Sequence, residues 1–283
     1  MASTDLAEGP LASGDIESAC ALVAEAGWNQ NAADWALFLE LGAASGVKAK
    51  DGRLIATAAT LPYPSGFGWI SMVLVAAAFR RRGIATGLLE RCIARLRDAG
   101  MVPVLDATPA GREVYQPLGF RDGWPIQRWR RRADSTVPGT DDVRELRESD
   151  WPRVLALDAA AFGCDRSPLL ERLRGRSRGF ACVLEDRGRL RGFLLGREGR
   201  IATQLGPIVA EDEACAVELA ARALARLRAP VIVDALQRHA RFARWLEAHG
   251  FERERPYTRM ALGRAELFGD PGRTIAIAGP ELG

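Results

Sequence analysis

Apolar residues recur at helical and at strand-like spacings along the first part of the chain. Ile16, Ala19, Leu22 and Val23 recur at helical spacing, and Gly27 follows them as a stop signal. Short apolar runs bounded by glycine or proline predict strands. The elements expected are helices at 15–26 and 33–41, two strands around the Asp51-Gly52 turn, a strand at 68–75, a helix at 86–96, a strand at 102–108, a short helix within 111–120 and a strand at 124–132. This order is typical of an α/β chain.

Polar residues around a Pro-Gly turn then interrupt the pattern, and the same order of elements starts again. The elements expected in the second half are helices at 148–162, 214–227 and 240–251, a hairpin at 179–196, and strands at 200–211, 230–236 and 255–262. We therefore expect a domain boundary in the polar stretch.

Four local matches indicate that the two halves are copies of one fold. "DGRL" at 51–54 matches "RGRL" at 187–190, and "VLDA" at 104–107 matches "IVDA" at 232–235. "LGF" and "ARL" of the first half match "HGF" and "ARL" of the second. Any two α/β segments can share short matches, but the shared element order favours duplication. The domains expected are a first copy at 1–136, a linker at 137–141, a second copy at 142–264 and a C-terminal tail at 265–283.

Composition and charge narrow the classes of function. Hydrophobic residues make up 48% and charged residues 27%, as in soluble globular proteins, and no apolar run is long enough for a membrane span. A net charge of +3 without interleaved aromatic residues does not suggest nucleic-acid binding. The N-terminal stretch lacks the apolar core of a secretory signal, so we expect a cytoplasmic protein.

Cysteine and histidine usage argues against two further kinds of site. The five cysteines show no CxxC spacing, which disfavours zinc and favours core packing. The two histidines, His239 and His249, both lie late in the chain, so a Ser-His-Asp mechanism is poorly supported.

The stretch "VLVAAAFRRRGIATGLL" carries the most specific chemistry. Arg80, Arg81 and Arg82 precede a helix whose N-terminus is already electropositive, so an anion is expected there. A solvated turn is the alternative, but the apolar strand before it and Gly83 after it favour an anion cradle. The second copy has "AEDEACA" in this place, where three carboxylates would repel a phosphate.

"RRRGIA" after "MVLV" resembles the (Q/R)xxGx(G/A) signature of the GNAT superfamily of acyl-CoA-dependent N-acyltransferases. Ala85 takes the place of the last glycine, and the family's late Tyr-x-x-x-Gly-Phe is matched by Tyr115 to Phe120. Over residues 10–262 the chain resembles bacterial tandem GNAT proteins, with an active first copy and a degenerate second one. The resemblance implies an α/β fold of two tandem GNAT domains, each with a mostly antiparallel, splayed sheet flanked by helices.

The resemblance implies acetyl-CoA as cofactor. Its pyrophosphate would sit on the amides of Arg82–Thr86, and its pantetheine arm would pair with the strand at Val73–Val75. The cofactor-binding residues implied are Val73, Leu74, Val75, Arg80, Arg81, Arg82, Gly83, Ile84, Ala85 and Thr86. Arg80 and Arg81 are the favoured side-chain contacts to the phosphates.

Tyr115 matches the family tyrosine that protonates the CoA sulfur, although it could instead be a core residue beside Phe120. Leu246 takes its place in the second copy, which agrees with an inactive copy. Asp106 ends a buried strand and is a weak candidate for the base. Asp234 matches it in the second copy, which favours a shared structural role.

Residues peculiar to the tandem subgroup are the candidates for amine binding. Aromatic faces and a carboxylate suit a cationic amine, and the segment between the first two helices flanks the acceptor site in GNAT folds. The residues expected to bind substrate are Trp28, Asn29, Asp34, Trp35, Asp158 and Asp165. The tryptophans could instead close the core, and Asp165 could cap a helix.

The function expected is acetyl transfer from acetyl-CoA to the primary amine of a small molecule, by direct attack in a ternary complex, with the C-terminal copy expected to help form the acceptor site. A non-catalytic sensor of CoA or a metabolite and a protein lysine acetyltransferase are the alternatives. A Rossmann enzyme is disfavoured because GxGxxG is absent. The partners expected are a small-molecule amine, no nucleic acid and no membrane, with a monomer or homodimer as the assembly.

Overall fold

The computed structural model describes residues 1–283 except 1–5, 133–136, 138–142, 178 and 229. The chain forms two compact units. Unit 1 comprises Met1–Val104 with Gly199–Ile201, and unit 2 comprises Leu105–Glu198 with Ala202–Gly283. Apart from Val137, the predicted linker at 137–141 lies outside the described residues. The predicted domain limits therefore stay a prediction.

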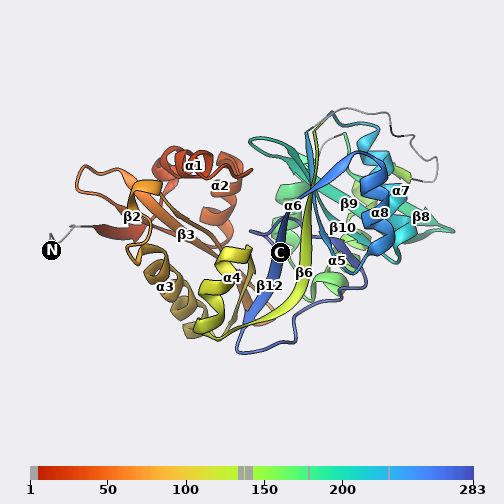
Figure 1. The fold of residues 1–283 in the computed structure, drawn as a ribbon. Coiled ribbons are helices and arrows are strands. Elements are labelled where there is room, and N and C mark those ends of the chain that lie inside the picture. Colours follow the sequence, from red (N-terminus) through yellow and green to blue (C-terminus); the bar gives the residue numbers. More distant parts are fainter. Residues whose placement is uncertain (1–5, 133–136, 138–142, 178, 229) are drawn as a thin grey trace. The chain divides into compact units, whose positions relative to one another are not determined.

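Unit 1 is a sheet with helices on both faces (Figure 1). Its strands are β1 (Ala7–Pro10), β2 (Ala43–Lys48), β3 (Leu54–Tyr63), β4 (Phe67–Val75) and the first half of β5 (Val102–Ala107), in that spatial order. Its helices are α1 (Ile16–Glu25), α2 (Ala32–Leu41) and α3 (Ile84–Asp98). Helices α1 and α2 lie on one side of the sheet and α3 on the other.

The local sequence explains most of unit 1. The expected face of α1 is buried, with Ala19, Leu22 and Val23 in the core. Neighbouring strands are antiparallel from β1 to β4, whereas β4 and β5 pair in parallel, only from Phe67 to Trp69. Strand β1 was not expected, because its four residues, AEGP, carry no apolar alternation.

Unit 2 contains the rest of the first copy's elements and all described strands and helices of the second copy. Its further strands are β6 (Phe120–Arg131), β7 (Val143–Glu145), β8 (Cys182–Asp186), β9 (Arg189–Glu198), β10 (Thr203–Ala210), β11 (Val231–Leu236), β12 (Phe251–Leu262) and β13 (Thr274–Ala276). Its helices are α4 (Pro109–Tyr115), α5 (Trp151–Phe162), α6 (Ser167–Arg176), α7 (Glu213–Leu224) and α8 (Ala240–Ala248). The mixed, mostly antiparallel sheet agrees with the expected fold class. No helix in the described part of the chain is long and apolar enough to cross a membrane.

The last strands of the two copies are exchanged within unit 2. Strand β6, which ends the first copy, lies between β11 and β12, both of the second copy. Arg131 is opposite Val231 on one side and opposite Phe251 on the other, so β6 is paired along both edges. The exchange places a first-copy strand where β12 would complete the second copy's own sheet.

Two buried ion pairs of the same design hold the exchanged strands. On β6, Arg128 donates two hydrogen bonds of 2.8 Å each to Asp234 of β11. On β12, Arg259 donates two of 2.9 Å each to Asp106 of β5. Each pair joins the inner strand of one copy to the last strand of the other, which gives Asp106 and Asp234 the shared structural role expected from the repeat.

Two elements of unit 2 differ from expectation. The segment 265–283, expected to be a tail, contributes β13, which pairs with β10, and Ile275–Ala278 are buried. A strand of three residues is too short to show a periodicity. Helix α6 was also missed, because its sequence SPLLERLRGR has three core leucines but ends in a basic, glycine-containing stretch.

Replacing Arg128 by Met is expected to lower the free energy of unfolding by about 3 kcal/mol, because it leaves the Asp234 carboxylate buried without its cation. Gln204 still donates a 2.9 Å hydrogen bond to Asp234, but this one bond offsets only part of the cost of burying the carboxylate charge. Urea denaturation at neutral pH measures the change. Arg121→Met, on the exposed part of the same strand, is the control and should change the value by less than about 0.5 kcal/mol. Equal effects of the two substitutions would contradict the structural role.

Candidate functional site

A bulge in β4 shapes the strand at the predicted cofactor site. Leu74 pairs with Thr57 and Ser71 with Ala59, so two residues of β4, Met72 and Val73, are opposite a single residue of β3. Met72 has a positive φ of 54°, and its carbonyl accepts a 2.8 Å hydrogen bond from the Thr57 hydroxyl. Bulges of this kind redirect a strand and are frequent beside functional sites.

The loop after β4 leads directly into the N-terminus of α3. Gly83 is the N-cap residue, with a φ of 79°, and no side chain caps the helix. The first amides of a helix have no partner within it, and their dipoles favour an anion. Gly83 thus permits the left-handed turn that leaves these N–H groups open for a ligand.

The three arginines of this loop are exposed, and among the described residues none of them pairs with an acid. Arg80 Nε donates to the carbonyl of Val75 at 3.0 Å. Arg82 donates to the carbonyl of Ala78 at 2.9 Å, and its guanidinium lies 5.1 Å from the Phe79 ring centroid. Arg82 is therefore held by the loop, whereas Arg81 makes no side-chain contact of this kind with the described part of the chain.

The loop, the bulged strand and the end of α1 line one pocket of about 490 Å³. Its lining residues are Ala26, Trp28, Val73, Leu74, Val75, Phe79, Arg80, Arg81, Gly83, Ile84, Ala85 and Thr86. Nine of the ten predicted cofactor residues are among them, and Arg82 is the exception. Open amides, unpaired guanidinium groups and the absence of any acid from the lining suit the phosphates of a coenzyme A molecule.

The corresponding place in the second copy is closed by carboxylates. The Asp212 side chain caps α7 by accepting a 2.9 Å hydrogen bond from the Cys215 amide, which lowers the pKa of Asp212. Glu211 and Asp212 also pair with Arg191. An acid of the protein itself thus occupies the helix N-terminus that is left open in the first copy.

A short segment from late in the sequence holds the loop between α1 and α2. Arg200 donates its amide to the carbonyl of Asn29 at 2.6 Å and its Nε to the carbonyl of Trp28 at 2.9 Å. The Ile201 amide donates to Asn29 Oδ1 at 3.0 Å. Sequence reasoning missed this contact, because no local signal links positions more than 170 residues apart.

The other predicted amine-binding residues of unit 1 are buried around the start of α2. Asn31 caps the helix by accepting from the amides of Ala33 and Asp34, and Asp34 returns a 2.9 Å contact by accepting from the Asn31 amide. Asp34 and Trp35 are both essentially inaccessible to solvent. Asp34 therefore acts in the cap of α2. Of the predicted amine-binding residues of unit 1, Trp28 is the one that lines the pocket.

Three predicted site residues lie in unit 2. Tyr115 ends α4, its ring centroid lies 6.0 Å from that of Phe120, and burial raises its pKa above the ordinary 10.0. Asp158 is buried and accepts hydrogen bonds of 2.8 and 2.9 Å from Arg166. Asp165 accepts from the Ser167 amide at the start of α6. Their catalytic or substrate-binding roles stay predictions.

Other candidate chemistry is absent or inert in the described residues. Asp106, the weak candidate for the base, has both carboxylate oxygens bound to Arg259. Burial raises the pKa of the Cys92 and Cys215 thiols to about 11, so neither is a thiolate at neutral pH. No group of three or more potential metal ligands occurs among the described residues.

Family models match both halves of the chain. The model described as "Acetyltransferase (GNAT) family" matches residues 20–120, and "Acetyltransferase (GNAT) domain" matches residues 154–275. Together they span more than three quarters of the sequence. The chain is a tandem GNAT protein. This membership supports an N-acyltransferase that uses acetyl-CoA, the general donor of the family.

Known relatives of this tandem GNAT protein agree with that assignment. An uncharacterized N-acetyltransferase, YitH of Bacillus subtilis, is 27% identical over 189 residues, which is 65% of this chain and 66% of that protein. A structure from Pyrococcus horikoshii, proposed to be an acetyltransferase, matches with a TM-score of 0.82 and 20% identity, over 100% of this chain and 98% of its own. A tandem GNAT protein from the clavulanic acid biosynthesis pathway matches with a TM-score of 0.63 and 14% identity, over 93% of this chain and 100% of its own. At these identities the two structures show a shared fold.

Replacing Asn29 by Ala is expected to speed hydrogen exchange at the Ile201 amide, because the substitution removes its side-chain acceptor. Exchange measured by mass spectrometry on peptides covering 199–202 checks this. Asn31→Ala is the control, and it should speed exchange at the start of α2 instead. Unchanged exchange at Ile201 would mean that the Asn29 contact does not hold the segment.

Proposed function

We propose that the chain is an acetyl-CoA-dependent N-acetyltransferase that acts on the primary amine of a small molecule. One observation carries the proposal. The open N-terminus of α3, two arginines free of acidic partners and the bulged strand β4 all line a single pocket. Together with the family membership, this pocket supports binding of the acyl donor by the first copy.

Each part of the pocket has a distinct task in this proposal. The amides at the start of α3 and the Arg80 and Arg81 guanidinium groups bind the pyrophosphate. Residues Val73–Val75 present the strand backbone to the pantetheine arm. Acetyl-CoA supplies the acetyl group as a thioester, a bond that an unprotonated amine can attack directly.

Tyr115 is the proposed acid. As the amine nitrogen bonds to the acetyl carbon, the carbon–sulfur bond breaks and Tyr115 gives its phenolic proton to the departing sulfur. The nitrogen releases its own proton to solvent, and the Tyr115 phenolate takes a proton back from solvent. Burial raises the pKa of Tyr115, which keeps the phenol protonated at neutral pH and available as a donor. The assignment rests on the Tyr115 to Phe120 motif and on this protonation state.

The loop after α1 supports an acceptor site next to the donor. Trp28 lines the pocket and offers an aromatic face for a cationic amine. Asn29, Asp34 and Trp35 are buried, so Trp28 is the proposed contact of unit 1 with the amine.

The double substitution Arg80→Gln with Arg81→Gln is expected to weaken CoA binding at least about tenfold, because it removes charge-assisted hydrogen bonds to the phosphates. Titration calorimetry with CoA measures the dissociation constant. The matched control is Arg95→Gln with Arg97→Gln, two exposed arginines in the last turn of the same helix. If both double variants bind CoA as tightly as the parent, the donor does not bind at this loop.

Tyr115→Phe is expected to lower kcat by about 100-fold while leaving the dissociation constant of CoA unchanged, because the acid acts only on the departing sulfur. An acid works in its protonated form, and burial raises the pKa of Tyr115 above the ordinary 10.0, so the phenol is protonated at neutral pH. The parent's kcat should therefore show no loss attributable to ionisation of Tyr115 around neutral pH, and a loss only at strongly alkaline pH. Thiol release from acetyl-CoA with a panel of amines provides the rates. CoA binding without thiol release from any amine would favour a sensor instead.

A further inference from the structure

Unit 2 contains an arginine-rich pocket that is separate from the proposed donor site. It has a volume of about 570 Å³ and is lined by residues from three segments. Arg144 comes from β7, Arg147 and Arg153 flank the start of α5, and Arg187 lies in the turn between β8 and β9. None of these segments belongs to the acid-capped turn between β10 and α7, so the pocket is not a remnant of a second donor site.

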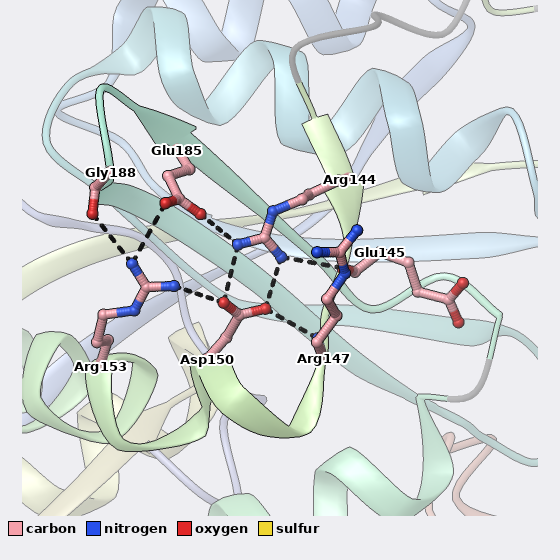
Figure 2. Close-up of polar contacts among 7 residues, drawn as sticks. All are labelled: Arg144, Glu145, Arg147, Asp150, Arg153, Glu185 and Gly188. Atoms are coloured by element: carbon pink, nitrogen blue, oxygen red, sulfur yellow. Dashed lines mark hydrogen bonds and ion pairs between the residues drawn. The ribbon is translucent and has the colours of Figure 1, made fainter.

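A buried carboxylate organises the frame of this pocket (Figure 2). Asp150 accepts hydrogen bonds of 2.6 and 2.8 Å from Arg144 and one of 2.6 Å from Arg153. Glu185 also binds both arginines, and Arg153 donates to the carbonyl of Gly188 at 3.1 Å. The Arg144 guanidinium lowers the pKa of Asp150, so the frame stays fully charged at neutral pH.

Positive charge is left over after these pairs are made. Asp150 and Glu185 balance Arg144 and Arg153, whereas Arg147 is exposed and no described acid pairs with it. Arg187 is 95% exposed, and its Nε makes one long ion pair of 4.0 Å with Asp186, which is itself 59% exposed. The Ser149 hydroxyl also lines the pocket and has no hydrogen-bond partner among the described residues. The frame thus carries one guanidinium group without an acidic partner, Arg147, a second with a single exposed ion pair, Arg187, and a hydroxyl donor.

We propose that this pocket binds the phosphate group of a small molecule. Guanidinium groups form paired, charge-assisted hydrogen bonds with phosphate oxygens. The ion-paired frame holds the backbone of the turns that carry Arg147 and Arg187. Ligand binding therefore costs little conformational entropy of these turns. This assignment is independent of acetyl transfer, since it uses none of the residues of the donor pocket.

Inorganic pyrophosphate is the probe that tests the pocket. It is titrated by calorimetry, at fixed ionic strength, into the full chain saturated with CoA, so that the donor loop is occupied. The parent should retain one pyrophosphate site, and Arg147→Gln with Arg187→Gln should weaken it at least about tenfold. The control, Arg241→Gln with Arg244→Gln, removes the same charge from exposed positions of α8 and should leave binding unchanged.

Repeating the titration in Arg80→Gln with Arg81→Gln, without CoA, separates this inference from the proposed function. One site that still depends on Arg147 and Arg187 supports the pocket, even if CoA does not bind the chain. AMP and glucose 6-phosphate, titrated in parallel, distinguish a nucleotide from a sugar phosphate or free phosphate as the source. No pyrophosphate site in the CoA-saturated parent, or equal weakening by both arginine double variants, would overturn the proposal. Unfolding midpoints of the variants check that the fold is retained.

Discussion

The paired guanidinium–carboxylate contacts on the exchanged strands are the constraint on which unit 2 depends. Each of the charges in Arg128–Asp234 and Arg259–Asp106 is buried, and an isolated charge there would be very costly. In the observed arrangement, with β6 against β11 and β12 beside β5, the two-pronged geometry satisfies both partners of each pair. The ion pairs therefore hold the exchanged strands in place, while the apolar residues around them supply most of the favourable burial energy.

The two copies use the N-terminus of an equivalent helix in opposite ways. At α3, glycine and arginine leave the amides open, and the loop has unbalanced positive charge. At α7, Asp212 bonds to an amide and Arg191 balances the acids. At α7 the helix amide and the acids are all paired with groups of the chain itself, so no ligand is needed there. The arrangement at α3 leaves polar groups without partners, which is typical of a site that a ligand completes.

Sequence reasoning located the pocket of the first copy because the contacts that form it are local, whereas the cofactor role of its residues stays a prediction. Val73–Val75, Arg80, Arg81 and Gly83 lie close together in the sequence, and they line one pocket with little contribution from distant segments. The exchange of strands could not be predicted, because both copies carry an aspartate on the inner strand and an arginine on the last one. The sequence pattern allows each arginine to pair with the aspartate of either copy, so it leaves the partner undecided. The 199–201 contact with Asn29 lacked any signal, whereas the Asn31-x-x-Asp34 spacing of a capping box could have revealed the role of Asp34.

The exchanged strands also bear on how such a duplicated chain can evolve. Once each copy supplies a strand that completes the other, neither half can be deleted or inherited alone without exposing open sheet edges. A second copy with an acid-capped turn in place of a phosphate loop is therefore still required as the structural partner of the first. Its β11 and β12 are constrained by the shared sheet, whereas the surface around α5 and the β8–β9 turn is free to acquire new chemistry.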